Sequence, residues 1–254
     1  MATSPRSPPP APAQEFEISR QSRIFAALSK KVIDLDELRM LAAQGVPDAA
    51  GVRSTVWKLL LGYLPYDRSR WEQELAKKRS QYAAFKDEFL SNPYSEIMEQ
   101  IDRDVKRTHP DMHFFCGDSS FAKSNQNFAE ADSFFCFVEL LSGFRDNFCQ
   151  KLDNSASGIR EACSRQVNPQ FYAFRWITLL LTQEFNFADT IHIWDTLLSD
   201  PDGPQETLLR ICCAMLILVR KRLLAGDFTS NLKLLQNYPP TDIRHLLYVA
   251  NKLH

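Results

Sequence analysis

The stretch RSRWEQELAKKRSQYAAFKDEFL, residues 68–90, indicates most directly which kind of fold this chain adopts. Wound as an α-helix, it places charges of both signs on one side and large apolar residues on the other, namely Trp71, Leu75, Tyr82 and Phe85. Asp67 opens the stretch, and Pro93 closes it because proline cannot continue a helix. The pattern predicts one long amphipathic helix.

Helical patterns of the same kind run through the rest of the chain. Asp34 is placed to cap a helix over residues 35–43, which Gly45 and Pro47 end. Further helices are predicted over residues 51–61, 95–108, 129–141, 171–183, 188–198, 206–224, 231–236 and 242–253. Residues 109–127 are mostly polar and predict an irregular connection, while alternating strand patterns are nearly absent. We therefore expect an all-α, irregular multi-helix domain over residues 15–254.

The ends and the overall charge narrow the class of protein. Residues 1–14, MATSPRSPPPAPAQ, are rich in proline and serine and predict a disordered leader without the apolar core of a secretory signal. The net charge of −1 offers no global field for holding nucleic acid or an anionic membrane, which leaves only a local basic patch as an alternative. No nucleic-acid partner is expected. The longest apolar stretch, residues 211–219, is far shorter than the roughly 20 residues of a bilayer span. We expect a cytoplasmic protein without a transmembrane segment.

Several kinds of active site lack their motifs. The sequence contains no GxGxxG, no P-loop, no GxSxG and no HExxH. His109, His113 and Cys116 lie close enough together to suggest metal ligands, but a fourth ligand at the usual spacing is missing, which favours an ordinary loop. Cys212 and Cys213 sit in an apolar run and are expected to be core thiols. No metal site and no autonomous active site are expected.

The segment SEIMEQIDRDVKRT, residues 95–108, carries the strongest chemical signal. Its apolar residues recur every four positions and predict one buried face: Ile97, Ile101 and Val105. Arg107 lies well away from that face near the end of the helix, and Asp104, three residues earlier, can restrain its guanidinium. Two roles fit an arginine so placed. It can reach into the active site of a partner, or it can cap the last carbonyls of its own helix, and spacing alone favours the cap.

Motifs elsewhere in the chain favour the role in a partner's active site over the helix cap, because the chain resembles the TBC-domain Rab GTPase-activating proteins. Residues 101–108, IDRDVKRT, match the family motif IxxDxxRT, and Gly45-Val46-Pro47 followed by Arg53 and Trp57 resembles its opening motif. The runs AEADSFFCFVELLSGFRDNF and QFYAFRWITLLLTQEF and the triplet Ile193-Trp194-Asp195 resemble its C-terminal half. The resemblance covers residues 34–254 and is greatest to the branch that contains TBC domain family member thirteen.

The resemblance implies a role for the arginine helix. Arg107 would be an arginine finger that stabilises the charge developing during GTP hydrolysis in a Rab GTPase, an effect of about 10³ to 10⁵ in rate, and Asp104 would position it. The partner would be a Rab in its GTP form, and GTP and Mg²⁺ would belong to the Rab, so the chain would need no cofactor. It would be a GTPase activator and not an enzyme, and it would reach endomembranes peripherally and only through partners.

Two departures from the family pattern stand beside the match. The family places a YxQG motif after the arginine helix, and its glutamine orients the attacking water; this chain has no YxQG, and Gln126 is the nearest glutamine downstream of Arg107. Segments found in relatives are also missing near residues 126–128 and 160–167. We therefore expect an incomplete TBC domain with impaired activity, since its helices lose packing partners. The alternatives are a non-catalytic helical module that binds Rabs or acts as a scaffold, and a chain that does not fold.

Six further residues are assigned either a GTPase-facing or a structural role: Arg53, Trp57, Phe174, Arg175, Trp176 and Asp195. For Arg53 and Trp57 the structural role, holding the N-terminal helices together, is favoured. The aromatic pair Phe174 and Trp176 with Arg175 would line the GTPase-facing groove or belong to the core, where large aromatic residues are more common. For Asp195 we expect a cap or an ion pair.

Overall fold

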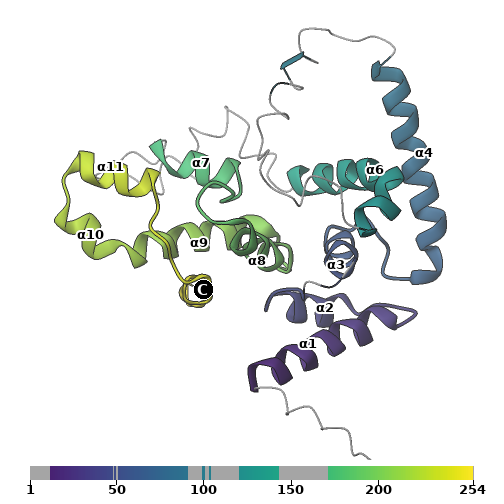
Figure 1. The fold of residues 1–254 in the computed structure, drawn as a ribbon, viewed down its shortest axis with the longest axis horizontal. Helices are drawn as coiled ribbons and strands as arrows, with labels where there is room; N and C mark the ends of the chain where they lie inside the picture. Colours follow the sequence, from purple (N-terminus) through teal and green to yellow (C-terminus); the bar gives the residue numbers. More distant parts are fainter. Residues whose placement is uncertain are drawn as a thin grey trace, which may run out of the picture.

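The structure is a computed structural model of residues 1–254, and it describes residues 12–47, 49, 51–90, 99–100, 103, 120–142 and 171–253. Within those residues every named element is a helix, and the one bridge outside them joins Val32 to Asp67. The all-α fold expected from the sequence is confirmed. Figure 1 shows two groups of helices side by side, which we call the N-terminal lobe and the C-terminal lobe.

The N-terminal lobe holds the first group of helices: α1 (Pro12–Ser29), α2 (Leu35–Ala42), α3 (Val52–Leu60), the 3₁₀ helix η1 (Arg68–Arg70), α4 (Trp71–Leu90) and α6 (Ser120–Ser142). Helix α1 packs on α2, and α2 packs on α3. Their facing sides form one hydrophobic core, whose most buried members include Ile24, Leu38, Leu41, Val56, Leu59 and Tyr63. The long helices α4 and α6 pack against each other.

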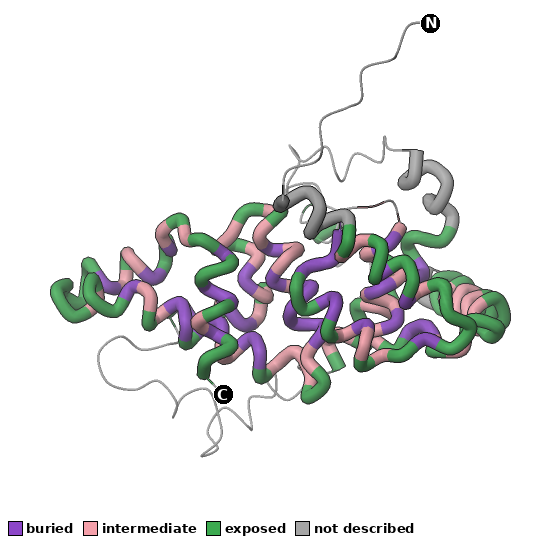
Figure 2. The backbone as a smooth tube through the Cα atoms, turned by 90° about the horizontal axis from the view of Figure 1, so that it is seen from below, coloured by how far each residue is buried: buried purple, intermediate pink, exposed green. Residues whose placement is uncertain are grey.

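The C-terminal lobe holds the second group: α7 (Ala173–Thr178), α8 (Phe187–Leu198), α9 (Pro204–Leu218), α10 (Arg220–Ala225), α11 (Phe228–Gln236) and α12 (Ile243–Ala250). Helix α9 is central and packs against α7, α8, α10 and α12. A separate hydrophobic core results, with Trp176, Leu181, Ile193, Leu208, Ile211 and Met215 fully enclosed. Figure 2 shows buried segments along both lobes and exposed ones at the two ends of the molecule.

Short polar side chains begin several helices, and the cap predicted at Asp34 is confirmed. Asp34 accepts hydrogen bonds from the amides of residues 36 and 37 at the start of α2, with N–O distances of 3.0 and 3.1 Å. Asn186, Asp227 and Asp242 cap α8, α11 and α12 in the same way. Each cap satisfies amides that have no partner inside the helix, which typically stabilises a helix by about 1 kcal/mol.

Several helix boundaries differ from the prediction; for example, the helix expected over residues 231–236 begins at Phe228, and the one expected over 242–253 ends at Ala250. Helix α6 begins at Ser120, inside the segment 109–127 that we expected to be irregular, because no proline or glycine interrupts residues 118–142. The expected helix 206–224 is divided at Val219, where φ and ψ of −96° and 5° interrupt the helical backbone. Helix α7 is shorter than 171–183, since Leu180 and Leu181 have φ angles of 48° and 63°. Helix α1 begins at Pro12, within the expected leader, of which residues 1–11 lie outside the described part.

The two adjacent cysteines of α9 differ in burial. Cys212 is a buried free thiol as predicted, but Cys213 is exposed, because neighbouring residues on a helix point about 100° apart and α9 buries only one side here. No helix within the described ranges is both long and apolar enough to cross a bilayer.

Candidate functional site

The residues of the predicted arginine finger, Arg107 and Asp104, lie outside the described residues, as do the three residues weighed as metal ligands. Of the segment 95–108, the structure describes Glu99, Gln100 and Arg103, all in helical conformation. Arg103 pairs with Glu99 one turn earlier, at 3.4 Å between Nη2 and Oε2, and both side chains are well exposed. This second arginine of the segment is therefore engaged on the surface of its own helix.

Three of the predicted residues meet where the two lobes join. Asp195 on α8 is completely buried and accepts a hydrogen bond from the indole of Trp57 on α3, at 2.7 Å between Nε1 and Oδ1. Its other oxygen accepts from the Val46 amide at 2.7 Å. The guanidinium of Arg53 lies 3.3 Å from Oδ1 and also donates to the Val46 carbonyl. One carboxylate of the C-terminal lobe thus ties together the loop before α3 and α3 itself.

The electrostatics of this joint follow from its burial. Burial raises the pKa of Asp195, while the Val46 amide, Arg53 and Trp57 act in the opposite direction. The carboxylate is therefore held by its hydrogen bonds and not by a large net electrostatic gain. The ring of Trp57 also packs on Trp194, with centroids 5.8 Å apart, which adds apolar contact across the joint.

A glycine lets the loop before α3 approach α8 closely. Gly45 has a φ of +90°, and a Cβ atom there would lie 3.0 Å from Nε2 and 3.1 Å from Cδ2 of His192. Burial lowers the pKa of His192, which favours the neutral ring that lies against this loop. Only glycine combines this backbone conformation with so short an approach.

Replacing Gly45 with alanine is expected to lower the free energy of unfolding by about 2–3 kcal/mol, from the strained φ together with the clash against His192. Gly62 offers a matched control, because its φ is +71° but nothing lies within 4 Å of its would-be Cβ. Gly62→Ala should therefore show the strain alone, about 1 kcal/mol. Urea denaturation of both variants measures the difference, and equal losses would rule out the close contact between the loop and α8.

The three residues predicted on α7, Phe174, Arg175 and Trp176, divide between the core and the surface. Trp176 is fully buried and lies edge-on to Tyr172 and Tyr238. Arg175 makes a bidentate ion pair with Glu184, at 2.8 and 3.0 Å, and also donates to the Gln236 carbonyl. Phe174 is 59% exposed and is the most exposed of these three residues.

The structure adds a buried polar cluster that we did not predict. Asp132 on α6 accepts hydrogen bonds from Lys58 (2.6 Å), from the Tyr63 hydroxyl (2.7 Å) and from both Nε and Nη2 of Arg79 (3.1 and 3.0 Å). Burial alone would raise the pKa of Asp132, but these donors outweigh it and lower the pKa to about 2. The cluster fastens α6 to α3 and α4. Its signal in the sequence is weak: Asp132 follows Ala131 directly, and these two residues form the buried side of α6.

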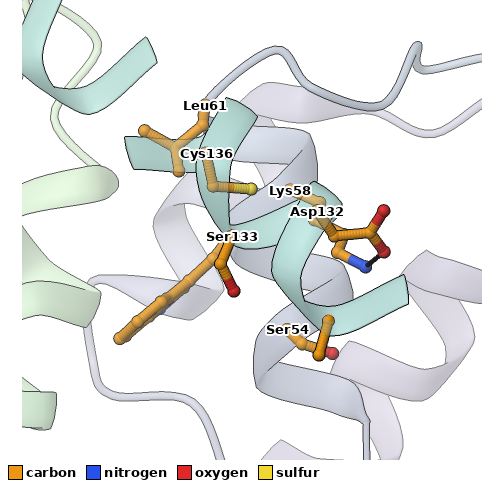
Figure 3. A pocket seen from close by; sticks show the side chains of 8 residues that line it. Ser54, Lys58, Leu61, Asp132, Ser133 and Cys136 are labelled. Carbon is orange, nitrogen blue, oxygen red and sulfur yellow. Dashed lines mark hydrogen bonds and ion pairs between the residues drawn. The ribbon is translucent and has the colours of Figure 1, made fainter. Parts of the chain in front are cut away.

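A pocket of about 240 Å³ opens beside this cluster, between α3 and α6 (Figure 3). Its wall combines apolar side chains with Lys58 and Asp132, and the thiol of Cys136 borders it. Burial raises the pKa of Cys136 to about 11, so the thiol stays protonated and is a poor nucleophile at neutral pH. The thiol beside this pocket is therefore not a candidate nucleophile.

Neutralising Asp132 is expected to loosen α6. Asp132→Asn should lower the free energy of unfolding by about 2–3 kcal/mol near neutral pH, because Lys58 and Arg79 lose the negative charge they pair with and only one of the two acceptor oxygens remains. Since the folded-state pKa is about 2 and the unfolded value about 3.9, the stabilisation by Asp132 is complete above about pH 4 and disappears as the pH falls toward 2.

Glu130 on the same helix is the control for this prediction. It pairs with Lys86 at 2.9 Å but is largely exposed, so Glu130→Gln should change stability by less than about 1 kcal/mol. Urea denaturation at pH 7 and pH 3 compares the two variants with the unchanged chain. Equal effects of the two substitutions at pH 7 would show that Asp132 does not fasten α6.

Comparisons with known proteins converge on one family. The model of the Rab-GTPase-TBC domain matches the chain in two pieces, residues 50–128 and 125–224. TBC1 domain family member 13 of Homo sapiens is 28% identical over 391 aligned positions, which cover 92% of this chain and 98% of that protein. The GTPase-activating protein gyp1 of Schizosaccharomyces pombe is 27% identical over 299 positions, covering 89% of this chain and 58% of that protein.

A solved structure has the same fold. The crystal structure of the YPT/Rab-GAP domain of Gyp1p superimposes with a TM-score of 0.73 at 25% sequence identity, covering 93% of this chain and 98% of that one. The alignment with TBC1 domain family member 13 is longer than this chain, 391 positions against 254 residues, so at least 137 positions have no residue of this chain opposite them. The two pieces of the family match meet at residues 125–128, within α6.

Proposed function

This chain belongs to the Rab-GTPase-TBC domain family, and from that premise we propose that it is a GTPase-activating protein for a Rab GTPase, with Arg107 as its arginine finger. The family match over residues 50–128 and 125–224 carries the proposal. The name of gyp1, a GTPase-activating protein, and the Rab-GAP title of the Gyp1p domain support it. The resemblance seen in the sequence is thereby confirmed at the level of the family.

The mechanism rests on the residues 101–108, IDRDVKRT. Arg107 inserts beside the γ-phosphate of GTP bound to the Rab and stabilises the charge on the transferred phosphoryl group, and Asp104 orients its guanidinium. GTP and Mg²⁺ belong to the Rab, and this chain supplies a side chain and a docking surface. The exposed Phe174 of α7 is the candidate contact on the C-terminal lobe, while Arg53, Trp57 and Asp195 hold the two lobes together.

The activity is lower than that of complete relatives. The sequence contains no Tyr-x-Gln-Gly, so the attacking water is oriented by the glutamine of the Rab itself. The length of the alignment with TBC1 domain family member 13 supports the loss of internal segments. The same observation favours a second function, in which the chain binds a Rab without accelerating its hydrolysis.

Single-turnover GTP hydrolysis by a panel of purified Rabs, with and without the full chain, tests the proposal. We expect one or a few Rabs to hydrolyse GTP faster in the presence of the chain. Binding of the GTP-loaded Rabs, measured in parallel by calorimetry, separates the two functions. Binding without acceleration would establish the second function, and neither binding nor acceleration by a folded chain would overturn both.

A further inference from the structure

The outer end of the C-terminal lobe presents basic and apolar side chains together on a tight turn. Helices α10 and α11 meet there through Gly226 and Asp227, at the left-hand end of the molecule in Figure 1. We call residues 220–228 the α10–α11 tip. Figure 2 shows this end of the molecule as largely exposed.

The α10–α11 tip carries a net positive charge, whereas the chain as a whole has a net charge of −1. Arg220, Lys221 and Arg222 are consecutive and exposed, and no ion pair engages them within the described residues. The hairpin of residues 220–236 holds four basic residues and one acidic residue, whereas the whole chain has a net charge of −1. The acidic residue, Asp227, uses its carboxylate to cap α11 through the Ser230 amide, at 2.8 Å. The positive charge is therefore concentrated at this end.

Two large apolar side chains flank the same turn. Leu224 is 68% exposed and Phe228 is 54% exposed. Large side chains at a loop tip more often fold back toward a core, because exposing them forgoes the gain from burial. Here they sit on either side of the turn, Leu224 two residues before the Gly226-Asp227 pair and Phe228 directly after it.

A buried amide holds the turn in this shape. Asn231 is 5% exposed, and its Nδ2 donates to the Leu223 carbonyl at 2.9 Å and to the Gly226 carbonyl at 3.4 Å. A Cβ atom at Gly226 would lie only 2.3 Å from Oδ1 of Asn231, so the amide fills the space inside the turn. Asn231 therefore connects α11 to the end of α10 and to the turn, and Leu224 and Phe228 lie exposed on this connected backbone.

We propose that the α10–α11 tip docks on anionic membrane surfaces, with Leu224 and Phe228 entering the interfacial layer and Arg220, Lys221 and Arg222 contacting the lipid phosphates. Apolar side chains combined with Lys and Arg are the surface chemistry that binds such membranes, since apolar burial and attraction to anionic headgroups add. From the sequence we had expected membrane contact only through partners. This surface gives the chain a direct contact, which does not depend on the proposed GTPase-activating function.

Vesicle sedimentation of the full chain without any Rab tests the proposal. We expect binding to phosphatidylcholine vesicles that contain phosphatidylserine, and little binding to phosphatidylcholine alone. Replacing Arg220, Lys221 and Arg222 with glutamine should lower the partition coefficient about a hundredfold, at about 1 kcal/mol for each charge and 1.4 kcal/mol for each factor of ten. The double variant Leu224→Ser, Phe228→Ser should lose binding as well, and its circular dichroism should be unchanged because both residues are exposed.

A matched control removes the same charge elsewhere. Arg23, Lys31 and Lys77 are exposed on the N-terminal lobe, and replacing all three with glutamine should leave vesicle binding nearly unchanged. In Phe228→Trp, a blue shift of the added tryptophan emission on vesicle binding should report entry into the interface. The proposal is overturned if the unchanged chain does not bind the vesicles, or if the control reduces vesicle binding as much as the tip variant. It is also overturned if the tip variants keep vesicle binding and lose only their affinity for a Rab in solution. That last result would make the tip a protein-binding surface.

Discussion

Arg107→Ala is expected to abolish the acceleration of Rab GTP hydrolysis while leaving Rab binding within about twofold. An arginine finger contributes about 10³ to 10⁵ in rate, and without a YxQG glutamine in this chain we expect the lower end of that range. Arg107→Lys should fail almost as completely, because an ammonium group lacks the planar fork that bridges two oxygens. Single-turnover hydrolysis at saturating chain concentration measures the rate, and calorimetry measures the binding.

The arginine one turn earlier provides the control. Arg103 lies on the same segment and pairs with Glu99, with both side chains 73% exposed. Arg103→Ala removes the same charge at nearly the same place, and it should retain the acceleration. If Arg103→Ala and Arg107→Ala reduce the rate equally, the effect is one of local charge, and Arg107 is not an arginine finger.

Asp195→Ala should have the largest effect on stability, a loss of about 3–5 kcal/mol in the free energy of unfolding. The substitution leaves the Val46 amide, the Trp57 indole and the Arg53 guanidinium without their common acceptor inside the joint. Asp195→Asn should lose less, because its amide oxygen still accepts one of these hydrogen bonds. Urea denaturation followed by circular dichroism gives the three free energies.

Asp202 serves as the comparison for Asp195. It follows α8 in an exposed turn, so Asp202→Ala should change stability by no more than about 0.5 kcal/mol. A loss below about 1 kcal/mol for Asp195→Ala would contradict the role of this carboxylate as the connection between the lobes.

The sequence predicts the helical class and most helices because their signals are local. Asp34, Asn186 and Asp242 begin helices where apolar periodicity starts, and these caps are formed within three or four residues of chain. The start of α6 was missed because its first residues carry no apolar stripe, and a helix does not require one. Cys213 was placed in the core because an apolar run does not reveal which side of a helix faces solvent.

The site is less accessible to sequence reasoning, because its contacts span long distances along the chain. A role for Asp195 as a cap or an ion pair could be expected, but its partners at residues 46, 53 and 57 lie some 140 residues away in sequence. Asp132 accepts hydrogen bonds from side chains on α3 and α4, and no sequence motif links these positions. Arg107 is the reverse case, since the motif around it is short and specific although its surroundings lie outside the described residues.

The separation of the two hydrophobic cores also determines how amide protons exchange with solvent. Each core is a cooperative unit, so amides deep in α2 and α3 and those deep in α9 should exchange only when their own lobe unfolds. The Val46 amide is different, because its acceptor is a side chain of the other lobe. It should exchange whenever the lobes part, well before either unfolds, and its protection factor in deuterium exchange therefore measures the free energy that keeps the two lobes together.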